Sequence, residues 1–349
     1  MQKTKKPTKT TKIIFAIAAV ALIIGLSIAF IIYKRALAPN VTDNQEYLYI
    51  PTNSTFDDLM KNLGENEILK DTASFRWVAD KKQYPLRVKA GKYKMEEGMN
   101  NRTLVNLLMA GLQEPVKLRF QNIRLKEDFA GFLATQLEPD SVAFIALLSS
   151  DSVAQEYGFN EENFFNMFIP NPYEFFWNTS TETFLERMHK EYNVFWNEER
   201  KKKAEALGMS PIEVSNLAAI VKGEALHVDE MPAIAGLYIN RLNKGMLLQA
   251  DPTVIFATQD FTIRRVLNKH LRTDSPYNTY MYRGLPPGPI MMPSIASIDA
   301  VLNYQKHSYI YMCAKDDFSG YHNFAHTMAE HLVNARKFQK ALDERNIKR

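Results

Sequence analysis

The sequence predicts an α+β protein that consists of a single N-terminal transmembrane helix, a small α+β module and a larger mixed α+β region. Three observations support this fold class. Residues 13–33 form an apolar run, short strand and helix signals alternate through residues 47–113, and two amphipathic helix patterns follow residue 206. A chain of 349 residues can hold two or three domains and a sizeable core.

The apolar run is long enough to cross a membrane. Residues 13–33 carry no charge, and a helix of 21 residues spans the ~30 Å of bilayer hydrocarbon. Five lysines and no acidic residue precede the run, so the positive-inside rule predicts a basic cytoplasmic tail, residues 1–12. The remaining chain then lies outside the cytoplasm, anchored by one span in the cell inner membrane. A cleaved signal peptide is the alternative, but the run is longer than the usual ~7 to 15 residues and is followed by Lys34 and Arg35.

Charge and cysteine content exclude several classes of function. Residues 1–35 hold seven positive charges and no negative one, so subtracting them from the formal charge of +4 leaves −3 for the rest. This mildly acidic remainder lacks the excess of basic residues that is typical of nucleic-acid-binding domains.

Cys313 is the only cysteine, and its apolar surroundings in residues 309–313 favour a buried strand over a catalytic thiol. The seven histidines lack metal-site spacing, so we expect no metal or cofactor.

The first part outside the membrane is predicted to be a compact module. After a linker, residues 34–46, the module covers residues 47–113. Its expected elements are a strand at 48–50, helices at 55–63 and 73–79, a strand at 91–95 and a helix at 103–110. In order and length these elements resemble the LysM-like module, whose relatives bind the glycan of peptidoglycan.

The larger region covers residues 114–345, with its core at 206–345. We expect a strand at 116–120, helices at 127–137 and 141–149, and one long charged helix at 181–207. An aromatic cluster lies between them, at residues 164–177. Its rings could line a sugar-stacking groove, but aromatic clusters are more often core, which we favour for Phe164, Phe165 and Phe168.

A helix with an acidic end is the main candidate for chemistry. In residues 211–224, Val214, Leu217, Ala218 and Val221 share one face, and Glu224 falls on its edge. An unpartnered carboxyl group at the end of an apolar face has a raised pKa, as a general acid near neutral pH requires. The alternative is a helix-end Glu directed into solvent. A short connection at 226–230 and a second helix after it place Glu224 at a junction that a substrate can reach.

Two loops supply polar side chains beyond the second helix. Residues 248–254 and 275–290 are rich in Pro and Gly, which restrict a loop to a few turn conformations. Their hydrogen-bonding side chains suit a hydroxyl-rich ligand such as a polysaccharide. Ordinary turns with local hydrogen bonds are the alternative. The candidate binding residues are Gln249, Asp251, Tyr277, Asn278, Thr279 and Tyr280.

The order of these motifs resembles the endolytic murein transglycosylases of the MltG, or YceG-like, family. The matching segments are residues 170–177, 217–224, 239–242, 249–254, 275–280, 284–290, 320–324 and 329–331. The resemblance implies an enzyme that cuts peptidoglycan glycan strands internally, at the β-1,4 bond between N-acetylmuramic acid and N-acetylglucosamine. It also implies a 1,6-anhydro-muramic acid product, no consumption of water, and a role beside peptidoglycan synthases.

The resemblance places the family's catalytic Glu on Glu224. Lys222 stands where the family often has a second acid, and Ala225 stands where a Thr or Ser often follows. One proton carrier suffices for this reaction, because the substrate's own C6 hydroxyl attacks C1. The six candidate binding residues are then expected to orient sugar and stabilise developing charge.

Two other functions stay open at this point. A hydrolase would need a second carboxylate, for which Asp251 is the candidate. A noncatalytic peptidoglycan-binding scaffold would need no carboxylate at all.

Overall fold

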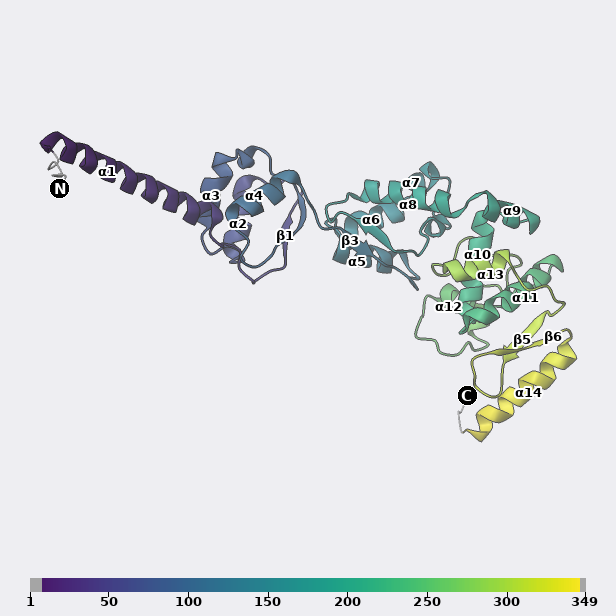
Figure 1. The fold of residues 1–349 in the computed structure, drawn as a ribbon. Helices are drawn as coiled ribbons and strands as arrows, with labels where there is room; N and C mark the ends of the chain where they lie inside the picture. Colours follow the sequence, from purple (N-terminus) through teal and green to yellow (C-terminus); the bar gives the residue numbers. More distant parts are fainter. Residues whose placement is uncertain (1–7, 346–349) are drawn as a thin grey trace. The chain divides into compact units, whose positions relative to one another are not determined.

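The computed structural model describes residues 8–345. The chain folds into two compact units. The first unit comprises residues 1–116 with 174–178, and the second comprises residues 117–173 with 179–349. Helices and short strands occur in both units, which confirms the mixed α+β class (Figure 1). The three strand pairs are two-stranded, so helices rather than sheets form most of the framework.

The first unit begins with a long apolar helix. Helix α1 covers Lys9–Ile32 and continues as a π-helix, Tyr33–Leu37. Within residues 8–345 this is the one helix long and apolar enough to cross a membrane, with a mean hydropathy of 2.9 and no buried residue in its most apolar part. A signal sequence near the N-terminus can have the same length and apolar composition.

The module that follows contains the elements expected from the sequence. They are β1 Tyr47–Ile50, α2 Phe56–Glu65, α3 Thr72–Lys81, a 3₁₀ turn at Tyr84–Leu86, β2 Gly91–Lys94 and α4 Asn101–Ala110. Strands β1 and β2 pair antiparallel, with Tyr47 opposite Lys94 and Ile50 opposite Gly91. Thr55 caps α2 through a capping box, and Gly111 ends α4 in the left-handed conformation that glycine adopts without strain. The small α+β unit is therefore present, whereas its LysM-like character stays a prediction.

Residues between the apolar helix and the module, where the sequence predicts a linker, are bonded to the module. The side chain of Asn101 donates to the carbonyl oxygen of Arg35 at 2.8 Å, and the Arg35 guanidinium lies over the Trp77 ring. Asn40 is buried, donates to the Asn101 side chain at 2.7 Å and accepts from the backbone N–H of Asp71. The end of the apolar helix is thus packed on the module.

The chain passes between the units in two short strands, β3 Val116–Leu118 and β4 Tyr173–Phe175. The first half of the second unit is helical: α5 Lys126–Gln136, α6 Ser141–Leu148, α7 Asp151–Glu156, a 3₁₀ turn at Phe164–Met167 and α8 Thr181–Phe195. Phe164, Phe165 and Phe168 are buried, which confirms their assignment to the core.

The charged segment 181–207 forms two helices, so the prediction of one long helix is wrong. Helix α8 ends at Phe195, and α9 covers Glu198–Ala206. Trp196 between them is 1 % exposed and packs into the hydrophobic core, while Asn197 caps α9. Burial of this large ring turns the backbone out of the helical path at a position that helix propensity alone would not break.

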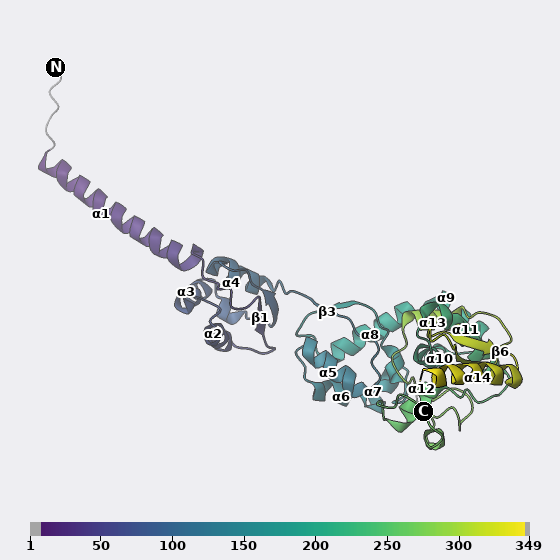
Figure 2. The same ribbon diagram turned by 90° about the horizontal axis from the view of Figure 1, so that it is seen from below.

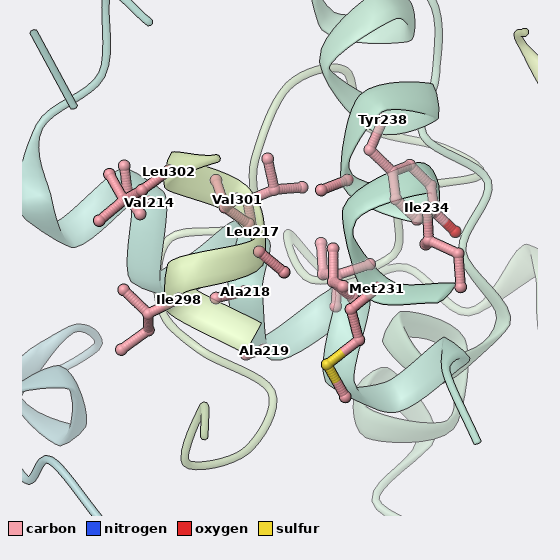
Figure 3. Close-up of a cluster of buried hydrophobic side chains, with 14 of the residues drawn as sticks. Val214, Leu217, Ala218, Ala219, Met231, Ile234, Tyr238, Ile298, Val301 and Leu302 are labelled. Atoms are coloured by element: carbon pink, nitrogen blue, oxygen red, sulfur yellow. The ribbon is translucent and has the colours of Figure 1, made fainter. Parts of the chain in front are cut away.

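The second half of the second unit is built around one central helix. It contains α10 Pro211–Glu224, a 3₁₀ turn at Val228–Glu230, α11 Met231–Asn243, α12 Asp251–Thr258, a 3₁₀ turn at His270–Arg272, α13 Ile295–Leu302, β5 Tyr311–Ala314, β6 His322–Ala325 and α14 Met328–Glu344. Helix α10 packs against α11, α12 and α13, and Figure 3 shows buried side chains of α10, α11 and α13. The hairpin β5–β6 lies along α14 (Figure 2).

Helix α10 is more deeply buried than the sequence pattern predicts. One apolar face was expected, but all eight residues from Val214 to Val221 are buried. Small side chains make this close packing possible, among them Ala218 and Ala219. Its N-terminus is fixed by Ser210 and Glu213, which form a capping box, and its C-terminus carries Glu224.

Candidate active site

A polar cavity of about 300 Å³ lies where the ends of three helices meet the β5–β6 hairpin. Glu224 comes from the end of α10, Tyr238 and Arg241 from α11, and Asp251 from the start of α12. The remaining lining residues are Leu237, Leu248, Gln249, Tyr280, Met312, Cys313, Ala314 and His322. The concentration of titratable side chains in one cavity makes it the candidate active site.

A glycine brings the end of α10 close to the start of α12. A Cβ atom on Gly223 would come within 2.8 Å of the Cβ atom of Pro252, a distance that real Cβ contacts essentially never show. The absence of a side chain at Gly223 therefore lets Glu224 and Asp251 line the same cavity. Asp251 is the first residue of α12, so its backbone N–H has no partner within the helix.

Glu224 is half-buried, and the pKa of its carboxyl group is raised to about 7, chiefly because burial removes water from it. The hydroxyl of Tyr238 donates to Oε1 of Glu224 at 2.8 Å, which lowers the pKa and offsets part of the rise. The negative charge of Asp251 raises the pKa further, while the Asp251 backbone N–H and the charge of Arg241 lower it. The carboxyl group is therefore poised to give and take a proton near neutral pH.

Arg241 supplies a buried positive charge that the sequence analysis did not assign to the site. It is 6 % exposed, and its Nε donates to the carbonyl oxygen of Ile310 at 2.6 Å. Its Nη1 donates to the carbonyl oxygens of Leu247 and Leu248 and to Oε1 of Gln249. No carboxylate forms an ion pair with this guanidinium within residues 8–345, so its charge acts on the cavity.

The sequence contains a pattern that predicts the burial of Tyr238 and Arg241. Ile234, Leu237, Tyr238 and Arg241 follow the spacing of one helix face, so an arginine continues the buried stripe of α11. A buried arginine needs several acceptors, and those acceptors lie just before β5 and in the segment after α11. Their positions depend on contacts distant in the sequence.

Four of the seven predicted site residues line the cavity: Glu224, Gln249, Asp251 and Tyr280. The hydroxyl of Tyr280 donates to Oδ1 of Asp251 at 2.6 Å. Gln249 has a φ of 52°, an uncommon left-handed conformation for a residue with a side chain. Its backbone N–H donates to the carbonyl oxygen of Thr279, which helps to hold this turn next to Asp251.

The other three predicted residues do not line this cavity. Tyr277 lines a separate cavity, where its ring packs against Phe256. Asn278 is fully buried and donates to the carbonyl oxygens of Leu271 and Thr273. Thr279 is also buried, and its Oγ1 accepts from the backbone N–H of Ala250 at 3.0 Å. The geometry gives Asn278 and Thr279 a positioning role behind the wall instead of contact with a ligand.

Replacing Thr279 by Val is expected to loosen this wall. The change keeps the shape but leaves the N–H of Ala250 without its acceptor, and it removes the 2.8 Å contact with the Thr253 hydroxyl. Loss of a buried hydrogen-bond partner costs about 1 to 3 kcal/mol of unfolding free energy. Urea denaturation followed by circular dichroism measures the loss. Thr262→Val, at an exposed loop position, is the control, and equal stability of the two variants would contradict the assigned role.

Cys313 lies in the cavity wall, and the prediction of a fully buried strand is wrong at this point. The strand begins at Tyr311, and its residues are half-exposed because one face of the hairpin borders the cavity. Burial and the charge of Asp316 raise the pKa of the Cys313 thiol. The raised pKa disfavours the thiolate, which agrees with the expectation that this cysteine is not a nucleophile.

A central buried helix with a proton-carrying Glu at its end, in a polar cavity, is an arrangement suited to acid catalysis on a hydrophilic substrate. The sequence model of the YceG-like family matches residues 48–337. The chain therefore belongs to the YceG-like family, which confirms the resemblance found in the motifs.

Named relatives agree with this membership. The chain is 29% identical over 342 residues to an endolytic murein transglycosylase of Bacillus subtilis, and the match covers 91% of this chain and 92% of that protein. It is 24% identical to an endolytic murein transglycosylase of Streptococcus pneumoniae, over 86% of this chain but 60% of that protein's length. A crystal structure of a YceG-like protein from Listeria monocytogenes matches with a TM-score of 0.55 at 25% identity, covering 82% of this chain and 98% of that one.

Proposed function

We propose that this protein is a membrane-anchored endolytic lytic transglycosylase of peptidoglycan. It cleaves the β-1,4 bond between N-acetylmuramic acid and N-acetylglucosamine within nascent glycan strands and leaves 1,6-anhydro-muramic acid ends. The observation that carries the proposal is the carboxyl group of Glu224, whose pKa is raised to about 7 in a polar cavity. Membership of the YceG-like family and the relatives named endolytic murein transglycosylase support the substrate and the reaction.

The reaction follows from the proton of Glu224. The protonated carboxyl group donates to the glycosidic oxygen as the bond to C1 of the muramic acid breaks. The C6 hydroxyl of the same sugar attacks C1, so the ring closes on itself and no water is consumed. The Glu224 carboxylate can then take up the proton that the hydroxyl loses. A second carboxylate, which a hydrolase uses to activate water or to form a covalent intermediate, is not needed.

The neighbouring residues have complementary roles in this proposal. Arg241 is held by carbonyl oxygens at a fixed place in the wall, where its charge favours the carboxylate that forms when Glu224 gives up its proton. Tyr280 fixes the side chain of Asp251 by its 2.6 Å hydrogen bond. Asp251 and Gln249 then present oxygens and an amide to sugar hydroxyl groups.

The activity is expected to fall as the pH rises through about 7, because the bond-breaking step uses the protonated form of Glu224. Tyr238→Phe removes the hydrogen bond that lowers this pKa, so the variant should keep activity to higher pH than the wild type. The measurement is kcat/KM as a function of pH on purified glycan strands. Tyr282→Phe, an exposed tyrosine outside the cavity, is the control. If kcat/KM of Tyr238→Phe falls at the same pH as that of the wild type, Glu224 is not the acid whose titration limits activity.

The anchor completes the proposal. Helix α1 crosses the cell inner membrane with the basic N-terminal tail in the cytoplasm, and the module and the second unit lie outside the cytoplasm. There the enzyme meets strands made by the peptidoglycan synthases of elongation and division, which are its proposed partners, and ends their growth.

Mass spectrometry of the products tests the function. The full chain, purified in detergent, is incubated with peptidoglycan, and the new ends are identified. Muropeptides that end in 1,6-anhydro-muramic acid are expected. Reducing ends that have gained a water would point to a hydrolase that uses Glu224 with Asp251, since both residues line the same cavity. Glycan binding without cleavage would identify a noncatalytic scaffold.

A further inference from the structure

A histidine and a glutamate form a hydrogen-bonded pair in the wall of the same cavity. Glu230 is 7 % exposed, and its Oε2 lies 2.8 Å from Nδ1 of His322. Its Oε1 accepts from the backbone N–H of His322 at 2.7 Å. The carboxylate therefore binds both the imidazole and the backbone of one residue, which fixes the ring tightly.

The pair fixes which ring nitrogen of His322 carries the hydrogen. A carboxylate only accepts hydrogen bonds, so Nδ1 of His322 carries the hydrogen that Glu230 receives. This leaves Nε2 as the nitrogen with a free lone pair. His322 lines the cavity, and within residues 8–345 no hydrogen-bond partner occupies its Nε2. The imidazole is thus oriented as a proton acceptor, by the arrangement in which a carboxylate selects the histidine tautomer.

His322 and Glu224 reach the cavity from different structural elements. His322 lies on β6 opposite Ala314 of β5, and Ala314 also lines the cavity. Glu224 lies at the end of α10. Two groups able to carry protons therefore enter one polar space from the hairpin and from the helical wall.

We propose that His322, oriented by Glu230, is a second catalytic residue that accepts the proton of the C6 hydroxyl. This inference rests on the proposed function and deepens it. As the bond between C1 and the glycosidic oxygen breaks, its electron pair goes to that oxygen, which takes the proton of Glu224. The C6 oxygen forms the new bond to C1 and passes its proton to Nε2 of His322.

The resulting imidazolium is stabilised by the negative charge of Glu230. The proton then returns to the Glu224 carboxylate through solvent, and both residues are ready for the next cut. Both proton transfers can occur in one step, because neither residue has to give a proton and take one in the same event. Without His322, Glu224 has to serve both transfers in turn, so the reaction is slower but not abolished.

A purely structural role for the pair gives a different result. Glu230 lies at the start of α11 and His322 in the hairpin, so their hydrogen bonds also tie these elements together. Loss of that tie would lower stability and could not be restored by a small molecule. Chemical rescue separates the two roles.

The experiment compares His322→Ala and His322→Gln with the wild type, all as full chains in detergent. Removal of a general base is expected to lower kcat by about 100-fold, with KM changed by less than about threefold. Added imidazole should restore the kcat of His322→Ala by about tenfold, since it can occupy the space left in the cavity wall. His322→Gln keeps a donor for Glu230 but accepts no proton, so it should lose the same activity at nearly wild-type Tm.

His326→Ala is the matched control, because His326 is exposed and follows the same strand. It should keep wild-type turnover and show no response to imidazole. An unchanged kcat in His322→Ala, or a loss that imidazole does not restore, would overturn the proposal. Absence of anhydro products from the wild type is a separate result, which would overturn the proposed function itself.

Discussion

Replacing Glu224 by Gln is expected to lower turnover by about 1,000-fold or more while the protein stays folded. The two side chains have nearly the same shape, and the amide can still accept the hydrogen bond of Tyr238. The amide cannot donate a proton to the glycosidic oxygen, so the loss falls on the bond-breaking step, for which general acid catalysis contributes up to about 10⁴-fold. Release of anhydro-muropeptides measures the turnover, and circular dichroism measures the fold.

Glu205→Gln is the control for this variant. Glu205 is an exposed residue of α9, and it does not line the cavity. The control should match the wild type in both measurements. Turnover of the Glu224→Gln variant within tenfold of the wild type would mean that another group supplies the proton.

Replacing Arg241 by Met is expected to have the largest effect on stability. The guanidinium binds three backbone carbonyl oxygens, of Leu247, Leu248 and Ile310, and so joins α11 to the residue that precedes β5 and to the segment before α12. Methionine fills similar space but donates no hydrogen bond, so these partly or fully buried acceptors lose their partner. At about 1 kcal/mol or more for each lost bond, the free energy of unfolding should fall by about 3 kcal/mol. The midpoint of urea denaturation measures this loss.

Arg241→Lys and Lys244→Met complete the comparison. Lysine keeps the charge but presents one nitrogen instead of the planar fork, so it should recover part of the stability. Lys244 is exposed at the end of the same helix, and its replacement should change the unfolding free energy by less than about 0.5 kcal/mol. If Arg241→Met unfolds at the same urea concentration as the wild type, water replaces the guanidinium as hydrogen-bond donor without loss of unfolding free energy.

Local sequence signals predicted helix α10 and singled out Glu224, which lines the cavity. Helix α10 has Pro211 at its first position and a capping box at Ser210, and both are properties of neighbouring residues. Glu224 was found because an acidic residue at the edge of an apolar stripe stands out in one helix turn. Gln249 and Asp251 were singled out as polar residues of a predicted loop at 248–254, and that loop prediction is wrong for residues 251–254, because α12 begins at Asp251.

The rest of the site depends on contacts that no local pattern encodes. Glu230 and His322 are 92 residues apart in the sequence, and only the fold brings the hairpin to the start of α11. In the loop that holds Asn278 and Thr279, polar side chains satisfy buried backbone groups, although the same composition suits a sugar-binding loop. Trp196 breaks a predicted helix for a similar reason, because its burial in the core outweighs local helix propensity.

The packing of residues 33–41 on the module determines how far the module can lie from the apolar helix. Asn40 and Asn101 hold the end of the apolar helix against the module, so no flexible tether separates them. With α1 in a bilayer, the module is kept within a few residues' length of the lipid headgroups and moves with the anchor. An anchored module then moves by lateral diffusion in a thin layer at the membrane surface, and a ligand farther from the membrane lies beyond its reach.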